Sequence, residues 1–92
     1  MTKEEEVIKA QEAERFVNDP IFKETIATIR EHYMRKWTES DQSDKEGREE
    51  CYRYLKVLSM IERNFLTVIQ IGQIAQEELS RVQKLKARFG RK

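Results

Sequence analysis

The chain has 92 residues, of which 38% are apolar and 38% are charged. A chain of this length buries roughly 60 to 65% of the surface that its unfolded form exposes, so residues 1–92 can form one small domain with a thin core. The net charge of +1 argues against a general binder of polyanions. Cys51 is the single cysteine, which excludes an intramolecular disulfide and fits a reducing compartment.

The N-terminal residues predict a first helix. Thr2 and Glu5 have the spacing of a capping box, in which each side chain accepts a hydrogen bond from the other residue's backbone N–H. The apolar positions that follow are mostly small, so this helix must gain its stability by docking, and we expect residues 1–7 to be frayed. Residues 1–15 lack the apolar core of a signal peptide, and we therefore expect no export by that route.

A second helix is predicted over residues 20–37. It begins at Asp19-Pro20, because proline fits the first helical turn and disfavours helix at the residue before it. Its apolar residues recur at intervals of four, three, four and four, which places them on one face: Phe22, Ile26, Ile29, Tyr33 and Trp37. We expect Ile29 in the core and Trp37 as a lid over it.

A long third helix is predicted after the polar residues 38–44. Ser43 and Glu46 have the spacing of a second capping box. Two neighbouring lines of apolar residues then run at seven-residue intervals, one being Tyr54, Ile61, Val68, Ala75, Val82 and Phe89, and the other Cys51, Leu58, Phe65, Gly72 and Leu79. The predicted fold is all-α: a helical hairpin of helix 20–37 against long helix 43–71, with the N-terminal helix packed across it and a C-terminal helical extension. Ile61 is expected in the core.

The apolar stripe extends beyond the reach of the second helix, and this excess predicts a partner-binding surface. It consists of Ile71, Ala75, Leu79, Val82, Leu85 and Phe89. Gly72 costs about 1 kcal/mol in a helix interior relative to alanine, so it is a position where the helix can break or bend. Either the chain folds back near Gly72 onto the first helix, or a second copy covers the excess. Gly90 ends the helix, and residues 88–92 are expected to fray.

Charge is unevenly distributed between two segments, which we name the acidic turn (residues 39–50) and the basic segment (residues 81–92). The acidic turn has six acids and two bases. The basic segment has no acid and six bases: Arg81, Lys84, Lys86, Arg88, Arg91 and Lys92. These six cations are compatible with a polyanion contact through counterion release, with simple solvation of a helix C-terminus, or with a contact to the acidic turn of another copy. We favour solvation over nucleic acid.

The sequence offers no pattern that indicates catalysis, a metal or a cofactor. His32 is the only histidine, and no cysteine pair or carboxylate cluster lies at metal-ligand spacing around it. Cys51 and His32 form no recognisable nucleophile motif, and the three glycines are scattered. The most apolar run, residues 65–75, is about half of what a bilayer requires. We therefore expect a soluble, intracellular protein that is not an enzyme and does not enter a membrane.

Several short motifs carry a resemblance to small helical proteins encoded by tailed bacteriophages and prophages. The residues that carry it, within about residues 16–80, are Asn18-Asp19-Pro20 with Phe22, Trp37-Thr38, Asp44 with Gly47-Arg48-Glu49, Glu62, and Gly72 to Ala75. The resemblance implies a phage origin and a location in the host cytoplasm or in the virion. No activity, cofactor or site residue comes with it.

The expected function is accordingly that of a non-enzymatic phage protein that acts through protein–protein contacts, in virion assembly or structure. Self-association, or binding to another phage or host protein, would provide the contact. Two alternatives remain open at this point. One is a nucleic-acid-binding accessory that uses the basic segment, and the other is a small inhibitor of a host protein.

Overall fold

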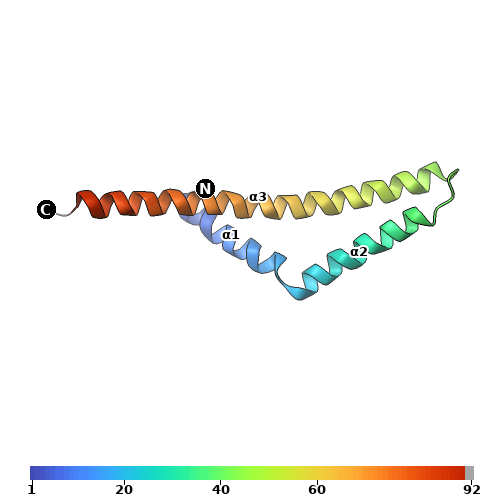
Figure 1. Ribbon diagram of the computed structural model, residues 1–92, viewed down its shortest axis with the longest axis horizontal. Coiled ribbons are helices and arrows are strands. Elements are labelled where there is room, and N and C mark those ends of the chain that lie inside the picture. Colours follow the sequence, from blue (N-terminus) through green and yellow to red (C-terminus); the bar gives the residue numbers. More distant parts are fainter. Residues whose placement is uncertain (91–92) are drawn as a thin grey trace. The chain divides into compact units, whose positions relative to one another are not determined.

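The computed structural model describes residues 1–90, which form three helices and no strand (Figure 1). The helices are α1 (Lys3–Val17), α2 (Pro20–Thr38) and α3 (Lys45–Phe89). They divide into two packing units: Met1–Phe16 with the part of α3 from Phe65 onward, and Val17–Asn64. The predicted all-α class is confirmed, as are the hairpin and the packing of the first helix on the long one.

Local side-chain caps explain where α1 and α2 begin. The Glu5 N–H donates to the Thr2 hydroxyl over 3.1 Å, and the Thr2 N–H donates to the Glu5 carboxylate over 3.4 Å. This is the predicted capping box. Asp19, in an extended conformation, accepts from the N–H groups of Ile21 and Phe22 at 2.8 and 3.1 Å, and Pro20 occupies the first turn of α2. Both starts were predicted because each depends on only a few consecutive residues.

The start of α3 differs by one residue from the prediction. Asp44, not Ser43, caps the helix, because its carboxylate accepts from the Gly47 N–H over 3.0 Å and its carbonyl accepts from the Arg48 N–H over 3.1 Å. Ser43 instead donates its N–H and hydroxyl to Asp41. These two bonds stabilise the charged form of Asp41 and lower the pKa of its carboxyl. Ser43 and Asp44 are both residue types that cap helices, and in this turn Asp44 forms the cap while Ser43 bonds to Asp41.

In the second unit, α2 and the N-terminal part of α3 form an antiparallel hairpin (Figure 1). The ring of Tyr33 stacks on that of Tyr54 with 4.5 Å between centroids, and Arg30 forms an ion pair with Glu62. Arg30 precedes Tyr33 in α2, whereas its partner Glu62 follows Tyr54 in α3, so the two helices are antiparallel. The buried apolar residues of this unit are Ile26, Cys51 and Leu58. Cys51, at 1% exposed, is the small buried hydrophobe that its position on the stripe predicts.

The prediction that Ile29 and Ile61 are core residues is wrong: they are 37% and 40% exposed. In this unit only α2 covers α3. The line of the stripe that contains Cys51 and Leu58 is therefore buried under α2, and the line that contains Tyr54 and Ile61 lies at the margin of the contact. Trp37 is also exposed and does not form a lid. The Arg48 guanidinium lies 4.8 Å from its ring centroid, so this tryptophan makes a cation–π contact at the surface.

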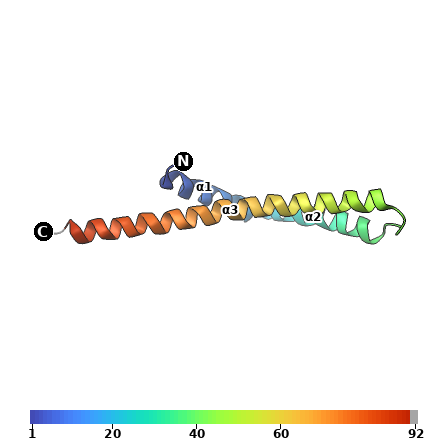
Figure 2. The ribbon, with the colours of Figure 1, turned by 90° about the horizontal axis from the view of Figure 1, so that it is seen from above.

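In the first unit, α1 crosses the C-terminal part of α3 at an angle (Figure 2). The rings of Phe16 and Phe65 stack with 5.4 Å between centroids. The buried side chains here are all alanines, namely Ala10, Ala13 and Ala75. Small residues let the two backbones approach closely, and the buried apolar area stays small as a result.

Gly72 neither breaks nor ends the helix, because α3 continues without interruption to Phe89. A Cβ atom placed on Gly72 would overlap the Cβ of Ala10 and lie 2.9 Å from the carbonyl oxygen of Glu6. The glycine is therefore explained by the close approach of α1. The predicted fold-back near Gly72 does not occur, because α1 covers this stretch while α3 continues. The other alternative, a second copy that covers the excess of the stripe, stays a prediction. Gly90 follows the last helical residue, as predicted.

Candidate protein-binding surface

The position of α1 determines which part of the C-terminal half of α3 is covered. Lys3, the first residue of α1, forms an ion pair with Glu78 over 2.7 Å between Nζ and Oε2. Phe16, near the end of α1, stacks on Phe65, and Lys3, at its start, pairs with Glu78, so α1 runs antiparallel to α3. The start of α1 therefore lies opposite Glu78. The α3 residues after Glu78 extend past the start of α1.

The Lys3–Glu78 ion pair also sets the electrostatics at this end of the contact. A hydrogen bond from Lys3 and its positive charge lower the pKa of the Glu78 carboxyl, and the charge of Arg81 acts in the same direction. Both partners are substantially exposed, so solvent screens the pair and its contribution to stability is modest.

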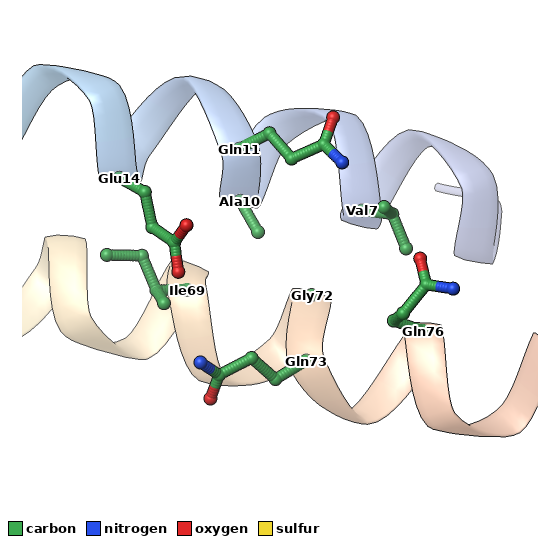
Figure 3. Close-up of a pocket in the computed structure, with 8 residues that line it drawn as sticks. All are labelled: Val7, Ala10, Gln11, Glu14, Ile69, Gly72, Gln73 and Gln76. Carbon is green, nitrogen blue, oxygen red and sulfur yellow. The ribbon is translucent and has the colours of Figure 1, made fainter.

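An open groove of about 150 Å³ runs beside the crossing of α1 and α3 (Figure 3). Figure 3 shows the Ala10 methyl group pointing toward the backbone of Gly72, with side chains of both helices around it. The lining residues are Val7, Ala10, Gln11, Glu14, Ile69, Gly72, Gln73 and Gln76. Glu14 is the one ionisable group among them, and the three glutamines offer amide hydrogen bonds. This lining supplies no nucleophile paired with a base.

The residues predicted to bind a partner do not share one environment. Ala75 is 3% exposed and buried against α1, so it does not belong to the accessible surface, and Leu79 is half-buried. Val82, Leu85 and Phe89 are 42%, 46% and 78% exposed. Spaced by three and four, these three lie along one face of α3. We call them the apolar stripe end.

The apolar stripe end continues the line that α1 covers. Val68, Ala75, Val82 and Phe89 follow one another at seven-residue intervals on α3. The first two are half-buried and buried, whereas the last two are exposed, although the sequence pattern does not change between them. The stripe is therefore longer than the helix that packs on it in this unit.

The described cations of the basic segment surround this apolar surface. Arg81, Lys84, Lys86 and Arg88 are all exposed on α3, whereas Arg91 and Lys92 lie outside the described residues. Arg81, Lys84 and Arg88 are spaced by three and four and so share one helix face. Leu85 lies within one helical turn of all three. The last two turns of α3 thus carry an apolar row beside a cationic row.

Sequence reasoning missed two surface features. Ile74 and Leu66 are exposed apolar residues of α3 outside the predicted set. Ile74 follows Ile71 by three residues, a spacing that could have placed both on one face. The second feature is that the acids of the acidic turn are not equally available for contact with a partner.

Three of the six acids in the acidic turn are engaged locally. Asp41 and Asp44 accept the hydrogen bonds described above, and Glu49 pairs with Arg53 over 3.2 Å. Glu39, Glu46 and Glu50 are exposed and form no ion pair within residues 1–90. Tyr54 and Val57 are exposed and follow Glu50 by four and seven residues on α3, so this part of the helix also combines charge with an apolar surface.

No group of three or more His, Cys, Asp or Glu side chains within residues 1–90 is arranged to hold a metal ion. His32 is exposed and makes an edge-to-face contact with its neighbour Tyr33. None of the helices in the described range combines the length and the apolar character needed to cross a membrane.

Comparisons with models of protein families, with curated proteins and with solved structures found no match to this chain.

Proposed function

We propose that this protein acts by binding other proteins through the exposed C-terminal part of α3, without catalysing a reaction. The observation that carries the proposal is the exposure of the apolar stripe end, Val82, Leu85 and Phe89, on a line of residues that α1 covers further toward the N-terminus. Exposed apolar residues at helical spacing on one face favour docking against another surface, because burial of that face stabilises the complex.

The setting that we propose is the assembly or structure of a tailed-phage virion, with the protein in the host cytoplasm or in the particle. This part of the proposal is supported by the phage-like motifs, including Asn18-Asp19-Pro20 and Trp37-Thr38. A helix that presents a binding face beyond its own core suits a component that joins other subunits.

The proposal is tested by replacing the apolar stripe end and asking whether a stoichiometric partner is lost. The full chain and the variant Val82→Ser/Leu85→Ser/Phe89→Ser are used to recover partners from bacteria that produce the virion. We expect the parent to recover one protein in stoichiometric amount, itself or another, and the variant to recover at least about tenfold less. Ile21→Ser is the matched control, because Ile21 is an exposed apolar residue of α2.

Recovery of the same partner by the parent and the triple variant would contradict the proposal. A host enzyme as the stoichiometric partner would favour the role of an inhibitor over that of an assembly component.

Nucleic-acid binding is the second candidate function, and one observation favours it. Arg81, Lys84 and Arg88 are exposed on one face of α3, where they can follow a phosphate backbone. We rank it below protein binding because the apolar stripe end lies beside these cations, and phosphate contacts do not require apolar side chains.

A further inference from the structure

We propose that the protein self-associates head to tail, with the last two turns of α3 of one copy docked on the acidic turn of the next copy. This inference rests on the proposed function and names its partner as a second copy of the chain. The two surfaces lie one in each packing unit.

The first surface is the apolar stripe end with its cations. Leu85 has Lys84 and Arg88 within one helical turn, and Val82 and Phe89 continue its apolar row. Residues 81–89 contain four bases and no acid. A partner with apolar side chains beside carboxylates would complement this surface in both charge and apolar character.

Charge excludes the simplest symmetric arrangement of this surface. If two copies paired through their C-terminal turns, the cations of each would face those of the other. Like charges placed together across an interface are unfavourable, and burial of the apolar residues between them would increase the repulsion. A second basic segment is therefore not the occupant.

The second surface has the complementary composition. Glu46 and Glu50 lie one turn apart on α3, exposed and without an ion pair within residues 1–90. Tyr54 and Val57 follow Glu50 by four and seven residues, so they lie on the same face of α3, where they are 45% and 49% exposed. Carboxylates beside these apolar side chains match cations beside Val82, Leu85 and Phe89 in both charge and apolar character.

A contact between two different surfaces has a consequence for assembly. Each copy offers one surface of each kind, so the contact repeats and generates a closed ring or an open chain of copies. A segment of nine residues buries less area than the roughly 800 Å² per partner of a standard interface. Each contact is therefore weak, and association should be visible at tens of micromolar protein and low salt.

The test is a charge exchange between the two surfaces of the full chain. Lys84→Glu/Arg88→Glu reverses the charge of two cations in the basic segment, and Glu46→Lys/Glu50→Lys reverses the charge of two carboxylates in the acidic turn. Sedimentation velocity measures the association of the parent, of each variant and of an equimolar mixture of the two variants. We expect the parent to associate and each variant alone to associate at least about tenfold more weakly. The mixture should regain association, because the glutamates introduced in one variant then meet the lysines introduced in the other, and the unchanged residues of the two variants also meet with opposite charge.

Circular dichroism establishes that each variant stays helical, and the matched control Glu24→Lys changes an exposed acid of α2 that forms no ion pair within residues 1–90 and lies outside the proposed contact. Raising the salt should dissociate the parent and the mixture alike. A parent that stays monomeric overturns the inference, as does association that both charge variants retain or a mixture that fails to recover. None of these results affects the proposed function if the triple serine variant still loses a different protein partner. Failure of both experiments would remove the function as well.

Discussion

Leu58 and Ile61 lie three positions apart on α3, and both belong to the predicted apolar stripe, yet their surroundings differ. Leu58 is buried, whereas Ile61 is exposed at the margin of the contact with α2. Periodicity places both on one broad face of the helix. Which line of that face is buried depends on how the partner helix docks, and a single sequence does not fix the docking angle.

We expect Leu58→Ala to lower the free energy of unfolding by about 2 to 5 kcal/mol, because it removes buried methyl groups and leaves a cavity. Ile61→Ala removes a similar side chain from a partly exposed site and should cost less than about 1 kcal/mol. Urea denaturation followed by circular dichroism measures both. Equal losses for the two variants would show that Ile61 is as deeply packed as Leu58.

Gly72→Ala tests the explanation for the glycine in the middle of α3. Alanine is favoured over glycine in a helix by about 1 kcal/mol, but its Cβ would overlap Ala10 and approach the Glu6 carbonyl oxygen to 2.9 Å. Overpacking costs about 1 to 3 kcal/mol, so we expect a net loss, together with faster amide exchange in α1. Hydrogen exchange and urea denaturation provide the measurements.

Two further variants make the Gly72 result specific. Gln70→Ala adds an alanine at an exposed position of the same helix and should not loosen α1. Ala10→Gly combined with Gly72→Ala removes the overlapping methyl group, and it should restore part of the protection of α1. A Gly72→Ala protein that is more stable than the parent, with α1 unchanged, would contradict the close approach.

At the scale of elements, each helix start depends on a few consecutive residues, which is why Thr2 and Asp19 could be identified as caps. The packing of α1 could be predicted only in outline. Its small apolar residues indicate that it must dock, but they do not identify Gly72 as the point of contact. The glycine was instead a candidate for a break, because an intrinsic penalty is visible in a sequence and a tertiary contact is not.

The Lys3–Glu78 ion pair makes the docking of α1 sensitive to acid. Because the pKa of Glu78 is lowered from its ordinary value of 4.5 in the folded state, its contribution is present above that value. The contribution is lost as the pH falls through the lowered pKa. We expect Lys3→Met to return the carboxyl titration of Glu78, followed by NMR, toward 4.5 and to remove this part of the pH dependence of amide exchange in α1.

Arg35→Met is the control for this titration. Arg35 pairs with Glu31 within α2, so its removal takes away an exposed ion pair without touching α1. The titration of Glu78 should stay as in the parent. If Lys3→Met also left it unchanged, the ion pair would not be the cause of the lowered pKa.

At the scale of the whole molecule, the length of the α3 stripe was the feature of the sequence that carried most information. It predicted correctly that α3 is long and that its face extends beyond the second helix. It did not reveal that α1 would cover Ala75 and leave Val82, because the seven-residue pattern is the same at both positions. The residue at which α1 begins therefore determines which part of this face of α3 stays accessible.

The cations of the basic segment would respond to salt differently in a phosphate contact and in a protein contact. Binding to duplex DNA through counterion release would make log affinity fall linearly with log salt, with a slope of about 0.9 per phosphate neutralised. The basic segment contains six cations, which limits that slope. We expect no measurable duplex binding at physiological salt in fluorescence anisotropy, since the net charge of the chain is only +1.

Truncation after Ser80 and the variant Lys84→Glu/Arg88→Glu provide the comparison. If weak duplex binding is seen at low salt, both changes should remove it, whereas Val82→Ser/Leu85→Ser/Phe89→Ser should leave it intact, because apolar side chains do not neutralise phosphate. A salt-sensitive micromolar affinity that depends on Lys84 and Arg88 but not on the apolar stripe end would place nucleic-acid binding ahead of protein binding. Loss of partner recovery in the serine variant, with no duplex binding in the parent, would assign the C-terminal turns of α3 to a protein.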